Sequence, residues 1–213
     1  MTKRIAGILL AAGGGSRLGR PKALVEFRGR TLAERGVALL RDGGADPVLV
    51  VTGAVPVSVP GARSVHNPDW ATGMGSSLVA GLRALQEPGE GDASPAVDGS
   101  GDADSPDAAV IALADQPLLG PESVRRLITA YRAGASVAVA AYDGKPRNPV
   151  LIGREHWPAV LEMVTGDTGA RPFLRAHPEL VTVVECGDTG SPDDVDTAAD
   201  LARIERDAPI RSD

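Results

Sequence analysis

The stretch LLAAGGGSRLGRPKALVEF, residues 9–27, joins the end of one apolar run to the start of another through three consecutive glycines. Glycines allow the backbone to approach a ligand closely and leave peptide N–H groups uncovered. Arg17 and Lys22 add positive charge, and Pro21 stiffens the chain before the lysine. A loop of this kind after a buried strand is suited to holding a polyphosphate. The same composition also fits a glycine-rich turn with two solvated cations.

The order of residues in this loop differs from two common phosphate-binding patterns. No Gly-Lys-Ser/Thr follows the glycines, and Leu18 stands where the third glycine of a Gly-x-Gly-x-x-Gly loop would be. The order instead resembles the signature of the MobA-like nucleotidyltransferase superfamily, which is Leu-Ala-Ala-Gly, a few small residues, Arg-Met/Leu-Gly, one residue and Pro-Lys. The matching residues are Leu10, Ala11, Ala12, Gly13, Arg17, Leu18, Gly19, Pro21 and Lys22.

That resemblance assigns roles to the loop. It implies that the glycine loop, with Gly14 and Gly15, wraps the triphosphate of a nucleoside triphosphate (NTP). It also implies that Arg17 and Lys22 neutralise the triphosphate as the catalytic cations.

Apolar runs typical of strands alternate with segments of helical periodicity along most of the chain. This alternation predicts an α/β fold of three layers, in which helices flank a mostly parallel sheet. The resemblance implies a Rossmann-like sheet of the GT-A nucleotidyltransferase type. We expect one domain over residues 1–213. The expected strands are 4–12, 48–52, 63–66, 108–114, 136–141, 149–152 and 180–185. One expected helix begins at Thr31, and the other expected helices cover 74–86, 121–133, 157–164, 171–176 and 197–206.

Composition excludes several classes of function. Aromatic residues make up only 3% of the 213 residues and no basic stripe stands out, so a nucleic-acid partner is not expected. No apolar run reaches the roughly 18 residues of a membrane span. The short apolar run after Met1 lacks the shape of a signal peptide, and Cys186 is the single cysteine. We therefore expect a cytoplasmic protein without membrane contact.

The negative charge is concentrated in one segment. The net charge is −6, yet residues 87–107 hold seven acidic residues and neither lysine nor arginine, so the remaining chain sums to about +1. From 88 to 107 the sequence is mostly Gly, Ser, Ala, Asp and Pro, with little to bury. We expect this segment to be a disordered acidic insert on the surface.

Several polar residues fall where predicted strands end. Ligands of open parallel sheets bind at the C-terminal ends of the strands, which is where the glycine loop, Thr52-Gly53 and Asp115 lie. A carboxylate beside a phosphate loop is well placed to hold Mg²⁺. Asp115 could equally cap a turn before Pro117. The triplet Asp115-Gln116-Pro117 also occurs at this place in the nucleotidyltransferases that the chain resembles, which favours the metal role.

A second acidic group occurs at Asp193-Asp194-Val195-Asp196-Thr197. In the family, an Asp-x-Asp-Thr-Pro-Glu-Asp stretch supplies the other metal ligand and opens the last helix. Asp194, Asp196 and Thr197 match it, but the proline and glutamate are missing. We favour Asp196 as the ligand and keep Asp194 as second choice, while a simple helix cap is the alternative.

Residues 67–82 carry the strongest indication of a substrate. Gly75, Ser76 and Ser77 place small residues and hydroxyls at a predicted helix start, where free N–H groups can bind a base or a sugar. A glycine-rich helix entry with a serine cap is the plainer interpretation. Asn67, Trp70 and Gly-Met-Gly-Ser-Ser-Leu together resemble the molybdenum cofactor cytidylyltransferases, which transfer CMP to molybdopterin.

Two further segments resemble that branch. Lys145-Pro146-Arg147-Asn148-Pro149-Val150 is similar to its Gly-Asn-Pro-Val segment on the acceptor side, with Arg147 in place of glycine. Residues 166–171 are similar to its Gly-Asp-x-Gly-Ala-Arg segment. Arg147, Asn148 and Arg171 are therefore candidates to bind the acceptor phosphate, although either arginine could be an ordinary surface cation.

The resemblance implies that an acceptor phosphate attacks the α-phosphorus of an NTP, with CTP favoured, and that pyrophosphate is released. The expected cofactor is Mg²⁺ on Asp115 and Asp196, the expected acceptor is a phosphorylated small molecule such as molybdopterin, and a molybdoenzyme or its chaperone is a candidate for transient contact. The alternatives are a guanylyltransferase or other NTP transferase of the superfamily, and a non-catalytic protein that binds or hands over the cofactor.

Overall fold

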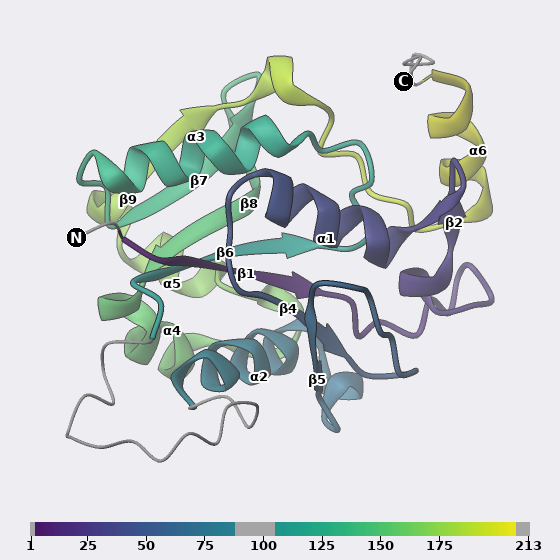
Figure 1. The fold of residues 1–213 in the computed structure, drawn as a ribbon, viewed down its shortest axis with the longest axis horizontal. Helices are drawn as coiled ribbons and strands as arrows, with labels where there is room; N and C mark the ends of the chain where they lie inside the picture. Colours follow the sequence, from purple (N-terminus) through teal and green to yellow (C-terminus); the bar gives the residue numbers. More distant parts are fainter. Residues whose placement is uncertain (1–2, 88–104, 208–213) are drawn as a thin grey trace.

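A seven-stranded sheet lies between two layers of helices (Figure 1). The computed structural model describes residues 3–87 and 105–207. The strands are β1 Ile5–Leu10, β2 Glu26–Phe27, β3 Arg30–Thr31, β4 Val48–Thr52, β5 Arg63–His66, β6 Ala108–Leu113, β7 Val137–Tyr142, β8 Lys145–Gly153 and β9 Val181–Glu185, and the helices are α1 Leu32–Asp42, α2 Met74–Gln86, α3 Pro121–Arg132, α4 Trp157–Met163, α5 Arg171–Ala176 and α6 Ala198–Asp207. The predicted three-layer α/β fold is confirmed.

The strand order is β5-β4-β1-β6-β8-β7-β9, and every neighbouring pair is parallel except the two that involve β8. The strand expected at 149–152 is longer, because it begins at Lys145 and forms a hairpin with β7. Asp143 and Gly144 connect the two strands and have φ values of 51° and 71°, which suit a tight hairpin turn.

The central strand β1 fixes where a ligand can bind. From β1 the chain first adds β4 on one side and later β6 on the other, so the connections diverge beside β1. Leu10 at the end of β1 pairs with Val51 of β4 and Leu113 of β6. The glycine loop after Leu10 and the Asp115 segment after Leu113 therefore leave the sheet as neighbours, at the kind of crevice where α/β proteins bind ligands.

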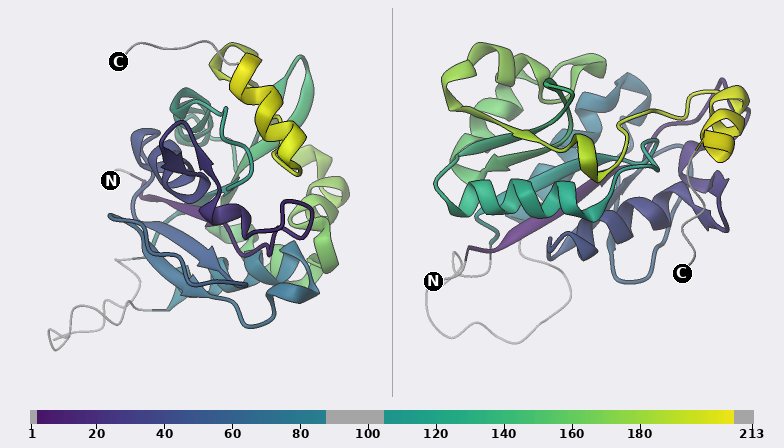
Figure 2. Two further views of the ribbon diagram at one scale, coloured as in Figure 1. Left: turned by 90° about the vertical axis from the view of Figure 1, so that its right-hand side faces the viewer. Right: turned by 90° about the horizontal axis from the view of Figure 1, so that it is seen from above.

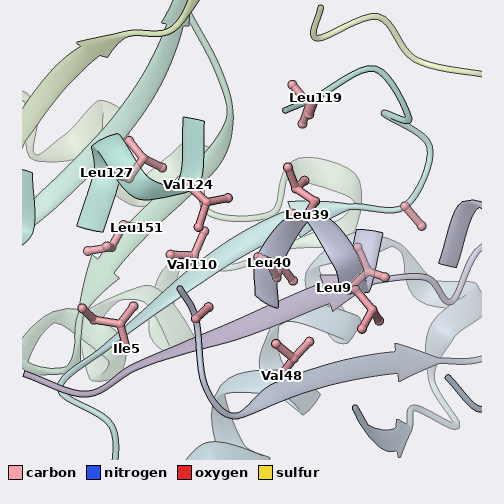
Figure 3. Close-up of a cluster of buried hydrophobic side chains, with 14 of the residues drawn as sticks. Ile5, Leu9, Leu39, Leu40, Val48, Val110, Leu119, Val124, Leu127 and Leu151 are labelled. Atoms are coloured by element: carbon pink, nitrogen blue, oxygen red, sulfur yellow. The ribbon is translucent and has the colours of Figure 1, made fainter. Parts of the chain in front are cut away.

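The core has two parts, one on each face of the sheet. Residues of α1 and α3 cover one face, where Leu9, Val110 and Leu127 are almost fully buried (Figure 3). Residues of α2, α4 and α5 cover the other face with Leu82, Trp157 and others. None of the helices within the described residues combines the length and apolar character that crossing a membrane requires.

The predicted start of α1 is confirmed. Thr31 Oγ1 accepts a hydrogen bond from the Glu34 backbone N–H, and the Glu34 carboxylate accepts one from the Thr31 N–H. This reciprocal capping box satisfies two donors that a helix N-terminus leaves free.

A third, smaller cluster joins the two ends of the chain. Val25, Phe27 and Leu32 are fully buried against Val195 and Ile204. Helix α6 consequently lies beside the β2–β3 hairpin, at the edge of the molecule (Figure 2). This contact holds residues 193–197 near the glycine loop.

Most of the acidic insert expected at 88–107 lies outside the described residues. Asp107 at its end is described, and its N–H donates to the Arg4 carbonyl while its carboxylate accepts from the Arg4 N–H at 2.7 Å. Asp107 therefore belongs to the ordered start of β6.

Candidate nucleotide-binding site

A cavity of about 330 Å³ opens at the C-terminal ends of β1 and β6. The glycine loop forms one wall, the turn before α2 forms another, and the Asp115 segment forms the floor. Its lining residues are Leu10, Ala11, Ala12, Gly13, Lys22, Trp70, Ala71, Gly73, Met74, Ser77, Leu113, Ala114, Asp115 and Asp167. Half of these were candidates from the sequence alone, and the sheet topology brings them together from distant segments.

Other sequence candidates lie behind the cavity wall. Thr52 is buried at the end of β4, and its carbonyl accepts a hydrogen bond from the Asn67 N–H. A Cβ on Gly53 would lie 2.4 Å from the Cβ of Trp70, so this glycine makes room for the indole that lines the cavity. The remaining nucleotide-binding candidates outside the lining are Gly14, Gly15, Gly75 and Ser76, and the catalytic candidate Arg17 and the metal candidate Asp196 also lie outside it.

A buried asparagine organises the start of α2. The Asn67 side-chain amide donates to Ser76 Oγ at 2.8 Å and to Ser77 Oγ at 3.1 Å. Ser76 Oγ in turn donates toward the Gly73 carbonyl. Ser77 is the serine that lines the cavity, while Ser76 serves the turn.

An ionic cluster lies at the floor of the cavity. Lys22 Nζ is 2.7 Å from Asp115 Oδ2 and also contacts Asp196 Oδ1. The Lys22 side chain is only 22% exposed. Burial lowers the pKa of Lys22, but the charges and hydrogen bonds of Asp115 and Asp196 outweigh burial and raise that pKa above its usual value. Lys22 is therefore a firmly charged ammonium between two carboxylates.

Arg17 lies at the outside of this cluster. Its Nη1 is 3.8 Å from Asp196 Oδ2, and its side chain is 75% exposed. Such an exposed contact is weak in water. Arg17 is therefore available to a ligand that arrives from solvent.

Backbone contacts bring the second acidic segment to the end of β6. The Val195 N–H donates to the Asp115 carbonyl at 2.8 Å, and the Gln116 amide donates to the Pro192 carbonyl at 3.0 Å. Asp196 consequently faces Lys22. Burial, with the nearby charge of Asp115, raises the pKa of Asp194, which lines a different cavity. The geometry thus places Asp196, rather than Asp194, on the lysine.

The cluster is chemically suited to a divalent metal. Asp115 Oδ1 is buried and has no hydrogen-bond partner among the described residues. Carboxylate oxygens are the ligands that Mg²⁺ prefers. No three His, Cys, Asp or Glu side chains within the described ranges converge closely enough to hold a metal by themselves. The residues fit a metal that takes its remaining ligands from phosphates and water.

Asp167 is a cavity residue that the sequence did not indicate. It lies in the short 3-10 turn Gly166–Thr168, and its Oδ1 accepts a hydrogen bond from the Met74 N–H at 3.1 Å. Gly73 has φ 120°, and a Cβ there would lie 2.5 Å from the Gly166 carbonyl carbon. Arg171 of the segment 166–171 was expected to bind the acceptor phosphate, whereas Asp167 of the same segment lines the cavity beside the glycine loop. No sequence periodicity connects residue 167 with residue 74.

A second cavity of about 410 Å³ lies between the β7–β8 hairpin and the segment 191–194. Arg147 and Lys145 line it, together with Asp193 and Asp194. Asn148 does not line it. Arg171 begins α5 and lines neither cavity. The three acceptor-binding candidates are therefore not gathered in one place by this structure.

Comparisons with known proteins place these features in a family. The sequence model of the family described as the MobA-like NTP transferase domain matches residues 7–181. The nicotine blue oxidoreductase of Paenarthrobacter nicotinovorans is 39% identical over 214 aligned positions, which cover 94% of this chain and 96% of that protein. A probable molybdenum cofactor guanylyltransferase of Opitutus terrae is 38% identical over 86 positions, which cover 40% of this chain and 43% of that protein.

The fold also has solved counterparts. The crystal structure of an Rv0371c homologue from Mycobacterium sp. strain JC1 superposes with a TM-score of 0.76 and 27% identity. The match covers 97% of each chain, so the described arrangement of sheet and helices is shared over nearly the whole length.

Proposed function

We propose that this chain, which belongs to the MobA-like NTP transferase family, transfers CMP from CTP to a phosphorylated acceptor, molybdopterin or its molybdenum-loaded form. The family match supports a nucleotidyltransferase, while the base and the acceptor belong to the proposal. The observation that carries it is the cluster of Lys22, Asp115 and Asp196 at the floor of the glycine-loop cavity.

The reaction forms one bond and breaks one. An oxygen of the acceptor phosphate attacks the α-phosphorus, the bond from the α-phosphorus to the bridging oxygen breaks, and that oxygen leaves with its electron pair as pyrophosphate. The protein needs no covalent intermediate. It has to align the two phosphates and neutralise their charge.

Each residue of the cluster has a part in that task. Lys22 and Arg17 would contact the triphosphate oxygens, and the N–H groups of the glycine loop would hold the β and γ phosphates. Asp115 and Asp196 would hold Mg²⁺, which supplies further charge neutralisation on the reacting phosphates. Lys22 would leave its carboxylate partners to reach the phosphates, which its flexible stem allows.

The rest of the cavity would hold the nucleoside. The backbone at Ala11–Gly13 and the Ser77 hydroxyl border the space beside Met74. The preference for CTP rests on the resemblance of residues 67–82 to the cytidylyltransferase branch. On the acceptor side, Arg147 is the candidate that lines the second cavity together with residues 191–194, whereas Asn148 and Arg171 do not line it. A transient contact with a molybdoenzyme or its chaperone would deliver the product.

The test is pyrophosphate release by the purified protein with Mg²⁺, each of the four NTPs in turn, and molybdenum-loaded molybdopterin as acceptor. We expect release with CTP. Release with GTP alone would keep the site and make the protein a guanylyltransferase. Absence of pyrophosphate release with all four NTPs, together with nucleotide binding measured by calorimetry, would point to another acceptor or to a non-catalytic carrier.

One relative favours a second candidate, an oxidoreductase. The similarity to the nicotine blue oxidoreductase extends over 94% of this chain, far beyond the glycine loop. A reduced nicotinamide dinucleotide also carries a pyrophosphate that a glycine loop can hold. The assay is loss of the absorbance of reduced nicotinamide dinucleotide in the presence of nicotine blue. Oxidation of reduced nicotinamide dinucleotide in this assay, without pyrophosphate release from any NTP, would replace the nucleotidyltransferase proposal by the oxidoreductase proposal.

A further inference from the structure

We infer that Lys22 occupies, in the nucleotide-free protein, the place where the metal would bind, so that the metal site forms only when a triphosphate draws the lysine away. This inference rests on the proposed function, because it concerns the order in which the same site takes its metal and its NTP.

The first step is the position of the ammonium group. Lys22 Nζ contacts Asp115 Oδ2 and Asp196 Oδ1, the same two carboxylates that would ligate a metal. A cation bonded to both carboxylates would lie within a few ångströms of Nζ. Two positive charges at so short a distance repel each other strongly in a partly buried site. The lysine and the metal therefore exclude each other.

The second step is the charge of the site without nucleotide. The two carboxylates are matched by Lys22 and, at 3.8 Å from Asp196, by Arg17. The site is thus close to neutral, and no third ligand of the His, Cys, Asp or Glu type completes it within the described part of the chain. A dication gains little from entering such a site.

The third step is what a triphosphate changes. Lys22 begins the short 3-10 turn Lys22–Leu24, and it lines the same cavity as Gly13, so its amine is within reach of a ligand on the glycine loop. A triphosphate brings about four negative charges, and Lys is a flexible point charge that binds phosphate well. When the amine turns to the phosphates, both carboxylates become free, and the phosphates supply the missing metal ligands.

The experiment measures Mn²⁺ binding, as a paramagnetic substitute for Mg²⁺, by the loss of the free-ion signal in electron paramagnetic resonance. It compares wild type with Lys22→Met, each with and without a CTP analogue whose α–β bridge is methylene. Arg203→Met is the matched control, because it removes the same charge from an ion pair with Asp193, in the segment that also carries Asp196. Lys22→Gln serves if the methionine variant does not fold, and circular dichroism verifies folding.

Without nucleotide, we expect Lys22→Met to bind Mn²⁺ at least about tenfold more tightly than wild type, since a buried competing charge is gone. Arg203→Met should remain within about twofold of wild type. In wild type, the CTP analogue should make Mn²⁺ binding tight, beyond the Mn²⁺ that the analogue binds in the absence of protein. Tight Mn²⁺ binding by nucleotide-free wild type, or no gain in either Lys22 variant, would overturn the inference.

This outcome is separable from the proposed function. If wild type releases pyrophosphate and also binds Mn²⁺ tightly without nucleotide, the inference is contradicted and the proposed function is supported. If Lys22→Met gains Mn²⁺ binding but wild type releases no pyrophosphate from any NTP, the inference is supported and the proposed function is contradicted.

Discussion

The Asp167 carboxylate accepts a hydrogen bond from the Met74 N–H at 3.1 Å, so a residue 93 positions away caps the first turn of α2. Gly73, the residue before the helix, offers no side chain for this purpose. The carboxylate also interacts favourably with the positive end of the helix dipole. The wall of the glycine-loop cavity therefore depends on the segment that also carries Arg171, a residue expected to bind the acceptor phosphate.

Asp167→Ala is expected to raise the KM for the NTP about tenfold, which corresponds to one lost charge-assisted hydrogen bond, with a much smaller change in kcat. The reason is that the Met74 turn loses its cap but the catalytic cluster is untouched. Steady-state kinetics measure both constants. Glu162→Gln, an exposed acid on α4, is the control and should behave as wild type. An unchanged KM in Asp167→Ala would remove Asp167 from the site.

Asp115→Asn is expected to lower kcat by about a hundredfold or more, because the amide keeps the shape but loses the charge at the floor of the cavity. Binding of the NTP itself should weaken much less, since the glycine loop is intact. Pyrophosphate release gives kcat, and calorimetry gives the binding constant. Intact turnover in this variant would show that Asp115 is not the metal-binding carboxylate.

Phe27→Ala is expected to lower the free energy of unfolding by about 3 kcal/mol, as is usual when a fully buried aromatic ring is removed. Phe27 packs with Val195 and Ile204, so the variant should also loosen the segment that carries Asp196. Urea unfolding measures the change. The matched control is Leu24→Ala, three residues earlier but 45% exposed, which should stay within about 0.5 kcal/mol of wild type. Equal effects in both variants would contradict the packing described here.

The two tyrosines of the chain provide a test in alkaline solution. Burial raises the pKa of both Tyr131 and Tyr142 to about 12, with nearby negative charges adding to it. Phenolate absorbance of the native protein should therefore be nearly absent at pH 11, whereas the unfolded chain should titrate near pH 10. Since the unfolded state releases these protons first, stability should fall from about pH 10 towards pH 12.

Tyr142→Phe is the control for that titration. It should remove about half of the phenolate amplitude and leave the midpoint of Tyr131 unchanged. A native midpoint near pH 10 would mean that the two hydroxyls are not shielded as described.

The sequence was most informative where local chemistry decides the structure. The capping box at Thr31 sets the start of α1, and the helix expected at 74–86 is observed with the same bounds. Alternating strands and helices suffice for the order of layers, and the strand ends locate Asp115 beside the glycine loop.

Long-range packing decided what could not be predicted. The contact of Asp196 with Lys22 depends on the Phe27–Ile204 cluster, whose members look like ordinary apolar residues in the sequence. Asp167 reaches Met74 because two loops meet above the sheet, which no local pattern records. The reversed direction of β8 also depends on a hairpin that was read only as a short strand.

The cluster that joins residues near 25 with residues near 204 has a consequence for how the protein is made. The ribosome delivers Asp196 174 residues after Lys22, and Leu201 and Ile204 of the apolar cluster come later still. The central strands and the glycine loop can assemble while Lys22 still lacks one of its two carboxylate partners. Completion of the ionic cluster at the cavity floor is therefore one of the last events of synthesis, and a chain that is cut short before α6 should keep the cavity lining but lack the packing that holds Asp196 against Lys22.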